Sequence, residues 1–145
     1  MPDHSERWLL NRLIEMCRDE ELTLRYVADH VKAPEARAFI LDLASRRSQF
    51  AADLAPHAQR LGGPGATDGT TRGTLHRRWM AIRHTLTGFN DSAMVNEVIE
   101  REDEAAAAYD EALSEMLPPT SRDLIEAQRA EIRLAHDRAI GTLMH

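Results

Sequence analysis

Four segments of the chain place apolar side chains at the three- and four-residue spacing that brings them onto one face of an α-helix. They cover about residues 5–30, 34–61, 91–116 and 120–145. Ala, Leu, Glu and Arg are abundant while aromatic residues make up only 5% of the 145 residues, which favours packed helices over a β-sandwich. The sequence therefore predicts an all-α, single-domain protein over residues 1–145, long enough to bury one core.

Residues that commonly begin or end helices lie at the borders of these segments. Gly62 to Gly65 should end the second helix, and Pro118 with Pro119 should end the third. The expected starting residues, one for each helix in turn, are Ser5, Pro34, Asn90 or Asp91, and Thr120 or Ser121.

The connection between the second and third segments is unusually long. Residues 62–73 are rich in Gly and Thr, and TLHRRWMAIRHTLTG, residues 74–88, indicates a shorter helix that ends at Gly88. A chain needs such a connection when it crosses from one end of a bundle to the other before starting a second helical pair. We expect an up-down four-helix bundle with a long crossover that carries a short extra helix between helices 2 and 3.

Two glutamates occupy matched positions in the apolar stripes of the first and third segments, Glu21 and Glu102. An unpaired carboxylate is costly to bury, so each requires a cation or hydrogen-bond donors. Bundles with a pair of iron or manganese ions use one Glu from each of two helices and a Glu-x-x-His pair from each of the others. The two glutamates meet only part of that requirement.

The second and fourth segments lack the Glu-x-x-His pair. Phe50 stands where the second segment would need a histidine, and Glu131 is followed by His136 only at the fifth residue, on a different face. An arginine offers another cation, because its guanidinium binds two carboxylates and remains protonated. We therefore favour a polar network without a cofactor, built from Glu21, Arg46, Arg47, Glu102, Gln128 and Glu131. The alternative is an iron or manganese site held by Glu21, Glu102, Glu131 and His136.

Charge, hydropathy and the first residues of the sequence indicate which partners and which cellular location to expect. The net charge is −6 and the basic residues are scattered, so a nucleic-acid partner is not expected. No apolar run approaches the ~18 to 20 residues that cross a bilayer, and no membrane partner is expected. Cys17 is the only cysteine, and the start MPDHSERW has no signal-peptide pattern. These features predict a cytoplasmic protein.

The chain also resembles a known family. The order of LLNRLIEMCRDEE, FILDLASRRSQFAADL, LGGPG, TLHRRW, EREDEAAAAYDEAL, LPP and AHDRA is similar to that of the bacterial PA2169-type proteins, DUF2383. The resemblance implies a ferritin-like bundle and brings no settled activity. This chain departs from the pattern with Asp19-Glu20 after the cysteine and Arg101 before the Glu-Asp pair. The most recognisable residues are Cys17, His76, Arg77, Trp79, Glu102, Asp103, Tyr109, His136 and Asp137.

Three functions are left open by the sequence. We favour a non-enzymatic or catalytically degenerate bundle, assembled as a homodimer or larger oligomer, with a stress-associated role implied only by analogy of fold. A metal-dependent oxidoreductase or metal-handling protein is the second. The third is a protein–protein interaction module that uses Trp79 of the crossover helix.

Overall fold

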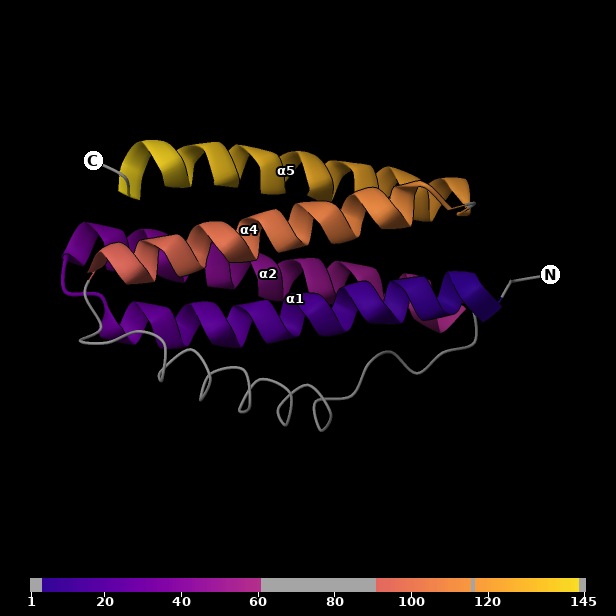
Figure 1. Ribbon diagram of the computed structural model, residues 1–145. Coiled ribbons are helices and arrows are strands. Elements are labelled where there is room, and N and C mark those ends of the chain that lie inside the picture. The colour runs from indigo at the N-terminus through magenta and orange to yellow at the C-terminus, as the bar shows by residue number, and fades with distance from the viewer. Residues whose placement is uncertain (1–3, 61–90, 116, 144–145) are drawn as a thin grey trace.

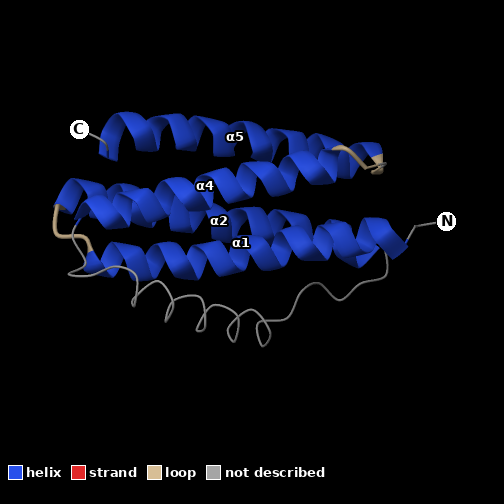
Figure 2. Ribbon diagram, viewed as in Figure 1, coloured by secondary structure: helices blue, strands red, loops and turns tan. Residues whose placement is uncertain are grey.

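The computed structural model describes residues 4–60, 91–115 and 117–143. These residues form helices α1 (His4–His30), α2 (Pro34–Arg60), α4 (Asp91–Leu113) and α5 (Pro119–Leu143), with no strand in the described ranges (Figure 2). The prediction of an all-α four-helix bundle is confirmed at this level. The short helix predicted from residue 74 lies outside the described residues.

The first two helices begin and end close to the predicted residues. α1 ends at His30, and the amide of Val31 donates to the carbonyl of Ala28 at 3.3 Å. α2 begins at Pro34, as predicted, because proline has the dihedral angle of a first helical residue and has no amide hydrogen to leave unpaired. The amide of Arg37 then donates to the carbonyl of Ala33 at 3.0 Å.

The turn between α4 and α5 differs from the prediction. α4 ends at Leu113 rather than Met116, and the side chain of Arg122 donates to the carbonyls of Leu113 and Glu115 at 3.1 and 2.9 Å. These two hydrogen bonds satisfy carbonyl groups that the end of a helix leaves without partners.

The predicted cap of α5 at Thr120 or Ser121 was wrong. The helix begins at Pro119, and the amide of Arg122 donates to the carbonyl of Pro118 at 2.9 Å. The proline pair therefore separates α4 from α5 and also supplies the first helical residue of α5.

The helices form two antiparallel hairpins, α1 with α2 and α4 with α5, that pack on each other (Figure 1). α1 contacts α4, and α2 contacts α5, across the two hairpins. In Figure 1, α2 and α4 run in the same direction, so the end of α2 and the start of α4 lie at opposite ends of the bundle. None of the described helices is long and apolar enough to span a membrane.

The core consists of two apolar clusters that follow one another along the bundle. On α1, one cluster includes Ile14 and Cys17 and the other begins at Leu24. The same change occurs on α2 between Ala44 and Phe50. Trp8 of α1 lies outside both clusters and is 52% exposed. The interval between the clusters on each of these helices contains a buried charged residue.

Candidate functional site

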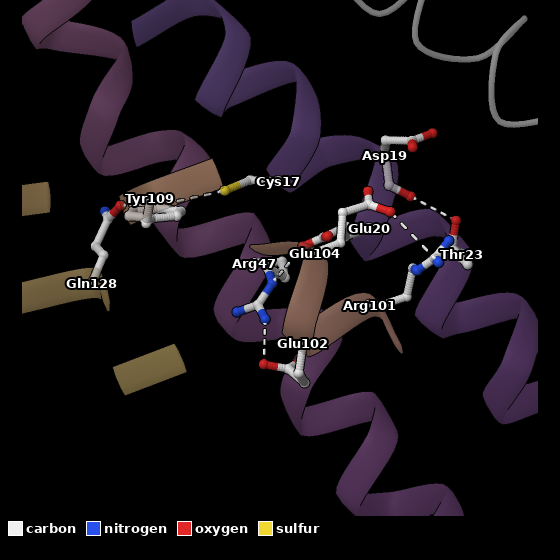
Figure 3. A network of polar contacts seen from close by, with 10 residues as sticks. All are labelled: Cys17, Asp19, Glu20, Thr23, Arg47, Arg101, Glu102, Glu104, Tyr109 and Gln128. Atoms are coloured by element: carbon white, nitrogen blue, oxygen red, sulfur yellow. Dashed lines mark hydrogen bonds and ion pairs between the residues drawn. The ribbon is translucent and has the colours of Figure 1, made fainter. Parts of the chain in front are cut away.

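Three charged side chains meet between the two apolar clusters: Glu20 of α1, Arg47 of α2 and Glu102 of α4 (Figure 3). Arg47 Nε donates to Glu20 Oε1 at 3.0 Å, and Arg47 Nη2 donates to Glu102 Oε2 at 2.6 Å. The exposed fractions of the three residues are 0% for each glutamate and 1% for Arg47. We call these residues the buried triad.

The helical repeat explains why the triad is buried. Glu20 lies seven residues from Leu13 and from Val27, both of which are buried. Residues seven apart lie on nearly the same face of a helix, because seven residues make about two turns. By the same spacing, Arg47 lies between buried Ile40 and Leu54, and Glu102 lies between buried Val95 and Tyr109.

Burial and mutual attraction shift the pKa values of the triad in opposite ways. Burial raises the pKa of Glu20 to about 8, although the Arg47 charge opposes this shift. Burial also raises the pKa of Glu102, again against the attraction of Arg47. Burial disfavours the charged form of Arg47, but Glu102 and Glu20 outweigh it and raise the arginine pKa, so the guanidinium is the permanent charge.

Each carboxyl group of the triad keeps one buried oxygen without a hydrogen-bond partner in the described part of the chain. These oxygens are Glu20 Oε2 and Glu102 Oε1. Arg47 therefore satisfies only one oxygen of each glutamate. The remaining face of the guanidinium lies near an apolar group, because its central carbon is 5.5 Å from the centre of the Phe50 ring.

A second set of buried polar groups extends across the bundle from α1 to α5. Tyr109 Oη donates to Gln128 Oε1 at 2.6 Å, and Gln128 Nε2 donates to the carbonyl of Phe50 at 3.3 Å. The carbonyl of Phe50 can only accept, so the amide nitrogen of Gln128 must face it and the amide oxygen must face Tyr109. Because the hydroxyl proton of Tyr109 is donated to Gln128, the Cys17 thiol must be the donor in its contact with Tyr109. Cys17 Sγ lies 3.5 Å from Tyr109 Oη.

Both the thiol and the phenol keep their protons in the core. Burial raises the pKa of the Cys17 thiol to about 12, although its hydrogen bond to Tyr109 acts the other way. Burial likewise raises the pKa of Tyr109 well above its usual value. A nucleophilic or redox-active cysteine requires an accessible thiolate, and Cys17 is a buried thiol.

The comparisons with known proteins can now be set beside this geometry. The family model described as Domain of unknown function (DUF2383) matches residues 8–115, well over half of the chain. The chain belongs to the DUF2383 family. No match was found among curated proteins. The match covers nearly all of α1 and the whole of α2 and α4. Helix α5 begins at Pro119, after the last matched residue, and supplies Gln128 to the core of this DUF2383 protein.

Three of the residues that the sequence assigned to a core network lie in the core of this DUF2383 protein. Arg47 contacts Glu102, and Gln128 is 3% exposed. Gln128 bonds with Tyr109 rather than with the triad.

The other three predicted members of that network lie outside the core, Glu21 partly buried at its edge and the other two exposed. Glu21 pairs with Arg25 at 2.9 Å, and Arg46 pairs with Asp42 at 2.9 Å. Glu131 is exposed. The prediction that these three residues belong to the core was wrong.

The core acid of α1 is Glu20 rather than Glu21. Both positions lie within the apolar stripe, three and four residues after Cys17 and before Leu24, so spacing alone does not separate them. The buried face of α1 turns here toward Asp19 and Thr23, which are 7% and 0% exposed. This turn places Glu20 inside and leaves Glu21 at the edge.

The proposed metal ligands Glu21, Glu102, Glu131 and His136 do not form one site. His136 Nε2 instead contacts Asp103 at 2.9 Å, and its Nδ1 lies 3.5 Å from the exposed Asp137. The described residues contain no group of three or more His, Cys, Asp or Glu side chains suited to a metal ion. The triad does not fit a metal either, because a cation beside Glu20 and Glu102 would meet the positive guanidinium of Arg47.

The residues that carried the family resemblance and lie in the described structure fall into two groups, one in the core and one near the surface. Cys17 contacts Tyr109 in the core, whereas Asp103 contacts His136 near the surface. His76, Arg77 and Trp79 lie outside the described residues.

One polar contact was missed by the sequence analysis. His57 Nδ1 lies 2.9 Å from Ser121 Oγ, which joins the end of α2 to the start of α5. Ser121 was predicted to cap a helix, but it is 4% exposed and bonds with another helix instead. Burial and the charge of Arg60 lower the pKa of His57. No local pattern connects these residues, because the contact depends on the packing of the two hairpins.

Proposed function

We propose that this protein is a catalytically degenerate, ferritin-like bundle in which the guanidinium of Arg47 serves as the central cation instead of a metal pair. Its role would be non-enzymatic. The buried triad carries this proposal, since Arg47 lies 3.0 Å from an oxygen of Glu20 and 2.6 Å from an oxygen of Glu102. A guanidinium supplies fixed positive charge and directed donors to both carboxylates.

The arrangement of the helices supports the ferritin-like part of the proposal. Two antiparallel hairpins are joined so that α2 and α4 run in the same direction (Figure 1). Bundles of the ferritin-like class use one long crossover connection, and residues 61–90 separate α2 from α4 here. One carboxylate from each hairpin points to the shared centre, Glu20 from the first and Glu102 from the second.

The second polar set supports the non-enzymatic part. General acids, bases and nucleophiles require access to a substrate and a pKa close to the working pH. Cys17 and Tyr109 are fully buried, and burial raises both of their pKa values. Their hydrogen bonds connect helices α1 and α4, and Gln128 extends the connection to α5.

Metal analysis of protein purified without a chelating tag tests the proposal. We expect no stoichiometric iron or manganese, and no increase in the melting temperature when either ion is added. An Arg47→Ala variant provides a positive test, because low concentrations of guanidinium ion should restore part of its lost stability. Stoichiometric iron or manganese that disappears in a Glu20→Ala/Glu102→Ala variant would overturn the proposal.

A further inference from the structure

The buried triad contains two carboxyl groups and only one cation. Arginine remains protonated in proteins, so ionisation of both glutamates would leave one net negative charge in the core. Glu20 and Glu102 are each 0% exposed, and each has one oxygen without a hydrogen-bond partner in the described structure. Burial of a net charge with incomplete hydrogen bonding is strongly unfavourable, and a group in this situation usually becomes neutral.

Among the residues that the structure describes, Arg47 is the one fully buried cation. On α4, Arg101 is engaged by Glu97 and Glu104. On α2, Arg46 pairs with Asp42 at the surface. The titratable groups that act on the two carboxyls come from all four helices. They are Glu20 and the thiol of Cys17 on α1, Arg47 on α2, Glu102, Asp103 and Glu104 on α4, and His136 on α5. His136 is itself in contact with Asp103.

We propose that the core of the folded bundle binds one proton, held by Glu20 as a carboxylic acid, while Glu102 stays ionised as the partner of Arg47. This inference rests on the proposed function in one respect, that Arg47 serves as the central cation for both glutamates. It adds a ligand, the proton, and a response of the fold to pH.

The geometry distinguishes the two glutamates. The contact of Arg47 with Glu102 is 2.6 Å and the contact with Glu20 is 3.0 Å, and short contacts of this kind are typical of fully charged pairs. Arg47 and His136 lower the pKa of Glu102 and Asp103 raises it, whereas for Glu20 the charges of Glu104 and Glu102 both raise the pKa against Arg47. Glu20 is therefore the better proton carrier.

The direction of the pH response follows from where the proton is bound. Burial raises the pKa of Glu20 from 4.5 to about 8, so between these values the folded state holds a proton that the unfolded state has lost. Stability is then complete below the unfolded pKa and decreases as the pH rises through the folded pKa. The bundle should tighten on acidification and loosen in mild alkali, first where α1 meets α2 and α4.

Infrared difference spectroscopy of the whole protein can detect the proton directly. The carbonyl stretch of a protonated carboxylic acid should be present at neutral pH and disappear with a midpoint near pH 8. The band should be absent from Glu20→Gln. It should remain in the control Glu21→Gln, which changes the adjacent surface glutamate that pairs with Arg25.

Urea unfolding over the same pH range provides the second measurement. In wild type, the unfolding equilibrium constant should rise by up to about tenfold per pH unit between the two pKa values, because one proton is released. This slope should be lost in Glu20→Gln and kept in Glu21→Gln. If Glu20→Gln does not fold, the infrared titration of wild type still decides whether the folded core holds a proton, and Glu102→Gln, which should keep the acid band, tests the assignment to Glu20.

The outcomes separate this inference from the proposed function. Absence of the acid band at neutral pH in protein that contains no metal would overturn the proton inference alone. Stoichiometric metal in the purified protein would overturn both. Persistence of the band in folded Glu20→Gln would show that another carboxyl holds the proton and would refute the assignment to Glu20.

Discussion

Arg47 contacts two fully buried glutamates, Glu20 and Glu102. Its replacement by alanine would leave Glu20 and Glu102 in the core without a charge partner. Removal of one partner from a buried ion pair destabilises proteins by about 3 to 5 kcal/mol. We expect a loss of this size in the free energy of unfolding of Arg47→Ala, measured by urea denaturation near neutral pH.

The neighbouring arginine provides a matched control. Arg46 carries the same charge but is exposed and pairs with Asp42 at the surface. Arg46→Ala should change the free energy of unfolding by no more than about 0.5 kcal/mol. Equal effects of the two substitutions would contradict the central role of Arg47.

Cys17 should be unreactive in the folded protein. The thiol is fully buried, and its pKa of about 12 leaves almost no thiolate at neutral pH. Iodoacetamide should modify Cys17 only through the unfolded state, so the rate should rise steeply with urea across the unfolding transition. Mass spectrometry after short exposures measures this rate, and rapid modification in the absence of urea would show that the thiol is accessible.

At this scale the sequence predicted residue types better than exact positions. The spacing indicated buried acid on α1 and α4, and Glu102 lies where expected. The choice between Glu20 and Glu21 depends on a small rotation of the buried face, which is produced by packing against other helices. The choice between Arg46 and Arg47 had the same origin, because adjacent residues lie about 100° apart on a helix.

At the scale of the elements, the contact between Tyr109 and Gln128 joins α4 to α5 in the core. Tyr109→Phe removes the hydroxyl and leaves the buried amide oxygen of Gln128 without its donor. We expect a loss of about 1 to 3 kcal/mol in the free energy of unfolding, because an unsatisfied buried polar group carries its full desolvation penalty. Thermal and urea unfolding provide the measurement.

A double variant checks whether this loss belongs to the pair. Tyr109→Phe/Gln128→Leu removes both polar partners, so its destabilisation should be smaller than the sum of the two single effects. Strictly additive effects would indicate that the hydrogen bond contributes little to the pairing of α4 with α5.

The ends of the elements show why local signals conflict. Pro34 had no strong competitor and correctly predicted the start of α2. At the start of α5, Thr120 and Ser121 are good capping residues, but Pro119 is equally suited to the first helical position. The side chain of Ser121 contacts His57 on α2 instead of capping its own helix, and this contact depends on tertiary packing.

At the scale of the whole molecule, the triad should contribute more to specificity than to stability. Replacement of a complete buried ionic group by apolar side chains of similar size is often neutral or stabilising by about 1 to 4 kcal/mol. We therefore expect the triple variant Glu20→Leu/Arg47→Met/Glu102→Leu to be at least as stable as wild type. It should also lose the pH dependence that Glu20 confers. Calorimetry at several pH values tests both expectations, and a large loss of stability would contradict them.

The arrangement of the bundle could be predicted from the sequence in outline. The helical periodicity indicated four helices, and the long connection indicated a crossing between α2 and α4. The sharing of one polar centre by three helices could not be predicted, because it requires the rotation of each helix about its own axis. The contact of Arg47 with Glu20 links residues 27 positions apart, and its contact with Glu102 links residues 55 apart.

The division of the triad between the two hairpins has a consequence for how the halves of the chain recognise each other. The α4–α5 hairpin brings Glu102 without a cation, and the α1–α2 hairpin brings Arg47. Two copies of the second hairpin would bury two Glu102 carboxylates together, whereas two copies of the first would bury two guanidinium groups that each keep their Glu20 partner. The charges therefore favour pairing of the second hairpin with the first over pairing of the second hairpin with its own copies.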